Sequence, residues 1–146
     1  MLWLLYALGA AVIWGVNYAV SGRLLARGMS PQTLFFVDLV FGTLAVGALI
    51  GLTGRWSSTM AELRAARPDM PWLLLTVGAA TAAGLLIFMS IEAKNATVAS
   101  LIEVSYPLFT AFFAWVLFRQ TTINTATILG GLLIFTGVLI VARGNR

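Results

Sequence analysis

The sequence predicts an all-α integral membrane protein with five transmembrane helices, and three observations predict it. Of the 146 residues, 60% are hydrophobic and only 10% are charged, and the mean hydropathy is +0.97. A soluble domain carries roughly 25% charged residues, because it must cover its surface. The apolar runs are about 20 residues long, which is the length of helix that crosses about 30 Å of hydrocarbon.

Hydropathy divides the chain into five spans, at approximately residues 2–21, 33–53, 71–91, 97–118 and 125–142. The first span has no basic segment before it and continues past the length of a secretory signal, so we expect it to stay uncleaved. The turn "EAKNA" is so short that the third and fourth spans are expected to form an antiparallel hairpin. We take residues 1–146 as one domain with five transmembrane helices.

The polar segment between the second and third spans is long enough to hold structure of its own. Ser57 or Ser58 is expected to cap a short surface helix that runs through Glu62. Pro68 and Pro71 follow and would end that helix.

The composition excludes several classes of function. The chain has no cysteine and no histidine, so disulfides and the commonest metal ligands are absent, and we expect neither a metal nor another cofactor. The net charge of +4 comes from basic residues at helix ends, where lipid headgroups lie, and no basic stripe indicates nucleic acid. Catalysis is not expected, because isolated hydroxyls do not pair a nucleophile with a base. The expected partners are the lipid bilayer and a small-molecule substrate.

Basic residues are almost evenly divided between the two sides of the membrane. One side holds Arg23, Arg27, Lys94, Arg143 and Arg146, and the other holds Arg55, Arg64, Arg67 and Arg119. The positive-inside rule therefore has almost no bias to act on. Five spans are also half of a ten-span transporter built from inverted repeats. This balance is compatible with copies that insert both ways up and pair as a homodimer of inverted protomers.

Two carboxylates lie inside predicted spans, where a charge costs at least about 2.5 kcal/mol at the bilayer centre. Asp38 and Glu103 each lie about six residues into spans that start from the same side, so similar depths are expected. Burial favours the neutral form of a carboxyl group, so either residue could couple transport to protons or hold a cationic group. The alternatives are a structural hydrogen bond or an ion pair with an arginine for Glu103, and a packing or interfacial role for Asp38.

The fourth span places polar groups beside a proline. Glu103, Tyr106 and Thr110 have the i, i+3, i+7 spacing of one helical face. Pro107 lacks the amide proton that would bond the carbonyl of Glu103, which predicts a kink that could serve in gating. Glu92 and Lys94, at the preceding turn, fit an ordinary solvated helix end.

The first span carries a second polar stripe. Trp14, Asn17 and Ser21 have the same i, i+3, i+7 spacing, and Trp14 lies near the middle of the span, away from the headgroups that indole rings prefer. An aromatic face attracts cations. The alternative is that Trp14 and Asn17 bond a neighbouring helix. The predicted substrate-binding residues are Trp14, Asn17, Asp38, Glu103, Tyr106 and Thr110, with Glu103 and Asp38 also predicted to couple protons.

Three stretches of the chain are similar to a known family. "AVIWGVNY" in the first span, "EAKNATVASLIEVSYPLFTAFFAWVLF" through the fourth, and "GGLLIFTGVLIV" in the fifth together resemble the EamA-type repeat of the drug/metabolite transporter superfamily. A single copy resembles its small five-span bacterial and archaeal branch. The resemblance implies one half of an inverted-repeat transporter in a prokaryotic inner (plasma) membrane. Members move amino acids, nucleotide precursors, sugars and drugs, so the resemblance does not name a substrate.

One departure from the family shifts attention to the acids inside the spans. The family often ends its fourth span with a glycine and a glutamate, whereas this chain has Arg119 and Gln120. The leading hypothesis is a secondary transporter that works by alternating access. A small dual-topology ion channel and a non-transporting membrane subunit are the alternatives. A channel should carry a continuous polar line across the membrane, whereas the polar groups here gather toward one side.

Overall fold

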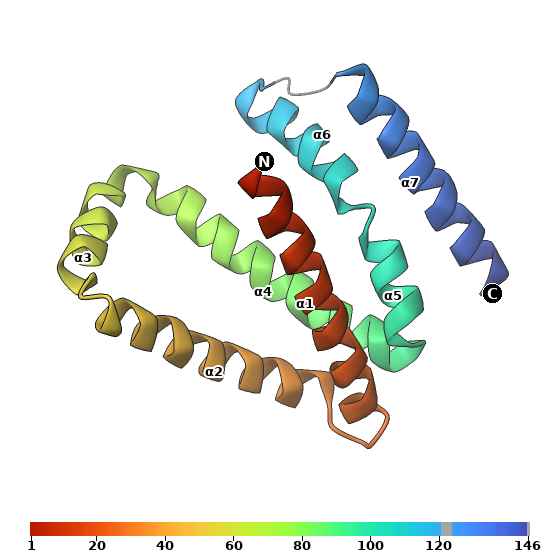
Figure 1. Ribbon diagram of the computed structural model, residues 1–146, viewed down its shortest axis with the longest axis horizontal. Helices are drawn as coiled ribbons and strands as arrows, with labels where there is room; N and C mark the ends of the chain where they lie inside the picture. Colours follow the sequence, from red (N-terminus) through yellow and green to blue (C-terminus); the bar gives the residue numbers. More distant parts are fainter. Residues whose placement is uncertain (121–123, 146) are drawn as a thin grey trace. The chain divides into compact units, whose positions relative to one another are not determined.

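The computed structural model describes residues 1–120 and 124–145, and in these residues every regular element is a helix. The helices follow one another along the chain as shown in Figure 1. They are α1 (Leu2–Leu25), α2 (Pro31–Leu52), α3 (Trp56–Ala65), η1 (Arg67–Asp69), α4 (Met70–Ala93), α5 (Ala96–Glu103), α6 (Tyr106–Phe118) and α7 (Thr125–Gly144).

Five stretches of helix are long and apolar enough to cross a membrane. They are Leu2–Leu25, Pro31–Leu52, Arg67–Ala93, Ala96–Phe118 and Thr125–Gly144. The five predicted spans are therefore confirmed, and their ends differ from the helix ends by at most four residues. Large apolar side chains are exposed along the spans, Leu5, Phe36, Leu74 and Phe109 among them, as the hydrocarbon of a bilayer requires.

The chain divides into two compact units, which are described separately. The first contains Met1–Arg23 and Ser90–Arg146, and the second contains Leu24–Met89. In the second unit, Ser30 caps α2 by accepting a hydrogen bond from the amide of Thr33 at 3.2 Å. The rings of Phe35 and Phe88 pack edge to face with centroids 6.0 Å apart. A Cβ added at Gly84 would collide with the ring of Phe35, so a larger residue there would force that ring to move.

The predicted surface helix is present as α3, which Figure 1 shows between α2 and α4. The predicted cap was wrong, because Arg55 occupies the N-cap position and makes no capping bond with its side chain. The Ser58 hydroxyl instead donates to the Arg55 carbonyl at 2.9 Å from inside the first turn. The helix ends at Ala65, ahead of both prolines. Pro68 then lies in η1 and Pro71 at the start of α4, where the missing amide proton costs little.

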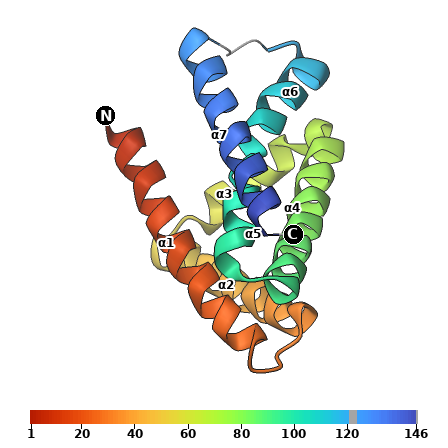
Figure 2. The ribbon, with the colours of Figure 1, turned by 90° about the vertical axis from the view of Figure 1, so that its right-hand side faces the viewer.

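In the first unit, α5 and α7 are in contact and lie side by side in Figures 1 and 2. Asn95 caps α5 and Asn124 caps α7, each accepting a 2.8 Å hydrogen bond from the amide three residues on. Lys94 donates to the Asn145 carbonyl at 2.8 Å and so ties the start of α5 to the end of α7.

The fourth span is interrupted, as Pro107 predicts. Helix α5 ends at Glu103 and α6 begins at Tyr106, with Val104 and Ser105 between them (Figure 1). Pro107 has no amide proton for the Glu103 carbonyl, and the amide of Leu108 bonds the Ser105 carbonyl at 3.0 Å in a tighter turn. A gating role for this interruption stays a prediction.

Arg119 ends α6 in a left-handed conformation, with φ at +55°. This conformation is the one that glycine adopts most readily after a helix. The Arg119 guanidinium lies 5.5 Å from the centre of the Trp115 ring, so a cation–π contact offsets part of the strain.

Candidate functional site

A short hydrogen bond joins α1 to the end of α5. The Tyr18 hydroxyl donates to Oε2 of Glu103 at 2.6 Å, and both side chains are partly buried. That distance is in the range of hydrogen bonds from a hydroxyl to a charged carboxylate, which are about twice as strong as neutral ones. The structure therefore gives the intramembrane carboxylate a phenol as its partner, from a helix 85 residues away in sequence.

Small residues bring α1 close enough for this bond. A Cβ added at Gly22 would lie 3.2 Å from the Ala96 Cβ, so a larger side chain at either position would push the helices apart. Tyr18 lies four residues before Gly22 and shares its face of α1. The contact at Gly22 therefore sets Tyr18 beside α5.

A groove of about 320 Å³ lies between α1 and α5. The Trp14 and Tyr18 rings form part of its wall, with centroids 5.4 Å apart and planes at 41°. The full lining is Ala11, Trp14, Gly15, Tyr18 and Ala19 from α1 and Ala96, Thr97, Ser100 and Leu101 from α5. The volume is at the lower end of the range for small-molecule sites. Glu103 is outside the lining, and Tyr18 connects it to the groove.

The predicted stripe on α1 is divided by the structure. Trp14 lines the groove and is 56% exposed, whereas Asn17 is outside the lining and partly buried. Ser21 is almost fully buried, and Oδ1 of Asn17 is buried without a hydrogen-bond partner among the residues that the structure describes. Tyr18, four residues after Trp14, is one of the groove residues that the sequence interpretation missed. The i, i+4 spacing of two aromatic residues was the signal that could have found it.

Tyr106 and Thr110 do not extend a common face from Glu103. The spacing argument assumes a continuous helix, and the interruption at Val104 and Ser105 removes that assumption. Tyr106 is 63% exposed, and the Thr110 hydroxyl donates to the Tyr106 carbonyl in its own helix at 3.1 Å. A substrate-binding role for these two residues stays a prediction.

Asp38 belongs to the second unit, so its predicted part in one site with Glu103 also stays a prediction. Its side chain is exposed on α2 and lines a hollow of about 530 Å³. The rest of that lining consists of Leu39, Gly42, Thr43, Val46, Gly47, Ile50 and Trp56.

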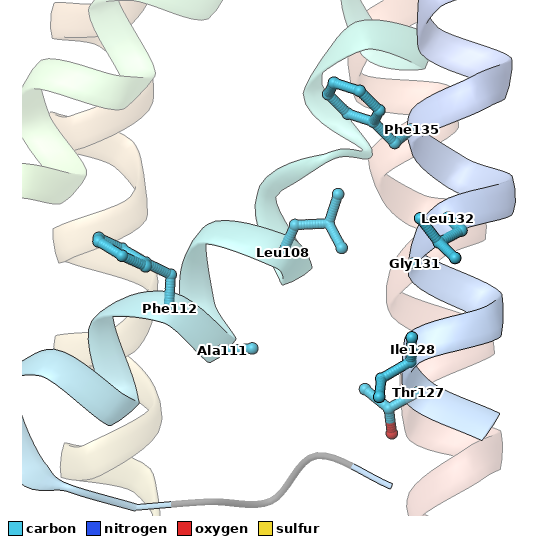
Figure 3. Close-up of a pocket in the computed structure, with 8 residues that line it drawn as sticks. All are labelled: Leu108, Ala111, Phe112, Thr127, Ile128, Gly131, Leu132 and Phe135. Atoms are coloured by element: carbon cyan, nitrogen blue, oxygen red, sulfur yellow. The ribbon is translucent and has the colours of Figure 1, made fainter. Parts of the chain in front are cut away.

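A further hollow of about 290 Å³ lies between α6 and α7 (Figure 3). Its lining comprises Leu108, Ala111, Phe112, Thr127, Ile128, Gly131, Leu132 and Phe135, with no charged residue. Leu108 points toward α7 in Figure 3, and a Cβ added at Gly131 would come within 2.5 Å of its Cδ2. This hollow is suited to helix packing or to lipid rather than to a polar substrate.

In residues 1–120 and 124–145, no group of three or more acidic, histidine or cysteine side chains could hold a metal ion. The features that define the protein are instead five membrane-crossing helices and a carboxylate on the fourth span that bonds a tyrosine on the first. Such a chain is a multi-pass membrane protein.

The particular family is shown by comparison with known proteins. The model of the EamA-like transporter family matches residues 1–143, so the chain belongs to that family. A search of curated proteins and a search of solved structures each found no match. The resemblance read from the sequence is therefore confirmed over nearly the whole chain, and with it a role in membrane transport.

Proposed function

We propose that the protein is a proton-coupled secondary transporter of small metabolites or drugs, which works by alternating access as an antiparallel homodimer in a prokaryotic inner membrane. Family membership supports the transport role. The observation that carries the coupling is the Tyr18–Glu103 hydrogen bond, which holds an acid in a membrane-crossing segment. Intramembrane acids mark ion and substrate pathways, because their cost must be offset by function.

The partner of Glu103 favours a role in proton transfer. Tyr18 is neutral, so it stabilises the carboxylate by a hydrogen bond and leaves its charge in place. A proton or a cationic ligand can then neutralise Glu103, because no ion pair with Tyr18 has to be broken first. An arginine partner would have favoured a permanent structural pair.

The interrupted fourth span supports a transport cycle. Non-helical backbone at membrane depth is tolerated only against protein or water. Transporters built from inverted repeats use such discontinuous helices at their binding sites. Glu103 is the last residue of α5, so the acid and the interruption coincide.

The dimer rests on the odd number of spans and the balanced basic residues. A five-span unit can form an inverted pair only with a second unit in the opposite orientation. The nearly equal division of arginine and lysine between the two sides favours insertion in both orientations.

Proton movement in proteoliposomes tests the proposal. Vesicles that contain the wild-type protein and an internal pH dye are given a panel of amino acids, nucleosides, sugars and organic cations. At least one compound should move protons. Glu103→Gln keeps the shape and removes the charge, so it should abolish that movement. Glu92→Gln is the matched control, because Glu92 is exposed near the end of α4.

Two results would overturn the proposed coupling. One is wild-type transport of a panel compound without proton movement, and the other is unchanged proton movement by Glu103→Gln. Size-exclusion chromatography of both variants shows whether a loss reflects unfolding. Tags on both termini test the dimer separately, because each terminus should be found on both sides of the membrane.

A further inference from the structure

Tyr18 contributes both to the groove between α1 and α5 and to the hydrogen bond with Glu103. Its ring forms part of the groove wall beside Trp14, and its hydroxyl bonds Glu103, which the groove does not reach. Tyr18 therefore connects the groove to the carboxylate.

The groove and the carboxylate together have the chemistry of a site for an aromatic cation. The Trp14 and Tyr18 rings provide flat apolar faces that also attract positive charge. Ala11, Gly15 and Ala19 are the small residues on the α1 side of the groove, so the two rings are its only bulky side chains there. Thr97 and Ser100 add hydroxyl groups on the α5 side, and Glu103 provides the negative charge.

We propose that the α1–α5 groove binds an aromatic ammonium compound, and that Tyr18 is the positioning residue that controls access of the ammonium group to Glu103. This inference rests on the proposed function, because it assigns a ligand class to the same carboxylate. In the structure the Tyr18 hydroxyl donates its hydrogen bond to Oε2 of Glu103. The ammonium group must replace that hydroxyl, while the aromatic part of the ligand packs on the two rings.

If the Tyr18 hydroxyl competes with the ligand, its removal raises the affinity for the ligand. If Tyr18 has only a structural role, its removal does not. A Tyr18→Phe change keeps the ring that forms the wall and removes the competing donor. Hydrogen bonds to charged groups are among the stronger ones, so their loss from the free state should be measurable. The variant should therefore bind an ammonium ligand more tightly than the wild type, whereas a lost packing contact would weaken binding.

The experiment measures binding of phenethylammonium to purified protein in detergent by calorimetry, with 2-phenylethanol as the neutral probe of similar size. Tyr18→Phe should raise the affinity for phenethylammonium about tenfold, which is about 1.4 kcal/mol. Glu103→Gln should lower that affinity about tenfold. Neither change should alter the affinity for 2-phenylethanol more than about twofold. Tyr6→Phe, on the exposed surface of α1 outside the groove, should match the wild type for both probes.

Three results would overturn the inference. They are unchanged or weaker phenethylammonium binding by Tyr18→Phe, equal changes for the charged and the neutral probe, and no binding of either probe by the wild type. Thermal melting of each variant identifies one that has failed to fold, and Glu103→Gln still tests the site if Tyr18→Phe is unstable. No proton gradient is used, so a failure here is distinct from a failure of proton coupling in vesicles.

Discussion

Polar side chains in the first unit differ in how well their hydrogen-bonding capacity is met. The Glu103 carboxylate has a short bond from Tyr18, whereas Oδ1 of Asn17, one residue before Tyr18, is buried without a partner among the described residues. An unsatisfied buried acceptor costs about 1–3 kcal/mol. In this chain Asn17 is therefore a source of instability that a ligand or a second protomer could relieve.

This difference predicts the effect of Asn17→Leu on stability. The change removes a buried acceptor and inserts an apolar group of similar size, so we expect the melting temperature of the purified protein to stay the same or to rise. Asn95→Ala is the contrasting variant, because it removes the 2.8 Å cap of α5 and should lower stability by about 1 kcal/mol. If Asn17→Leu lowers the melting temperature as much as Asn95→Ala does, the Asn17 amide has a partner in the assembled protein.

The sequence identified the acid of the candidate site but not its partner. Glu103 could be predicted because a charge in an apolar run is conspicuous without knowledge of the fold. Tyr18 could not, because its hydroxyl meets Glu103 only after α1 and α5 come together at Gly22 and Ala96. Tyr106 was favoured instead by a spacing rule that holds only in an uninterrupted helix.

At the scale of the helices, hydropathy predicted all five spans because each run of apolar residues is long. The ends were less predictable. Helix α1 continues to Leu25 through Gly22 and Arg23, since the end of an apolar run need not end a helix. The start of α3 was missed because a serine that favours the cap position also fits the first turn.

Close packing of α4 against α2 predicts contrasting effects of two glycine substitutions. At Gly84 a Cβ would collide with the Phe35 ring, which is itself packed on Phe88, so Gly84→Ala should destabilise the protein by about 1–3 kcal/mol. At Gly78, on the same helix, a Cβ would meet nothing within 4 Å, and alanine should be neutral or stabilising by up to about 1 kcal/mol. Thermal unfolding in one detergent measures both. Equal effects at the two positions would contradict the close approach.

At the scale of the whole molecule, the near balance of basic residues is the feature open to experiment. Three lysines added after Arg146 place three more charges on the side that holds Arg23, Arg27 and Lys94. The positive-inside rule should then fix that side in the cytoplasm. We expect terminal tags to show one orientation and transport activity to fall, because inverted partners become rare.

Three glutamines added at the same place control for the added length and should change neither topology nor activity. Co-expression with a chain that carries three lysines at its N-terminus should restore activity, since the two chains then insert in opposite orientations. Unchanged topology and unchanged transport after the lysines are added would contradict the inverted homodimer.

The interruption of the fourth span also has a mechanical consequence. Helix α6 has 13 residues and is therefore about 20 Å long, and we expect Val104 and Ser105, which precede it, to serve as its hinge. If the two residues of the hinge change their backbone torsions so that the helix turns by about 10°, its far end travels about 3.5 Å. A small event at the Glu103 carboxylate would then be amplified at the opposite end of α6, in proportion to the length of that helix.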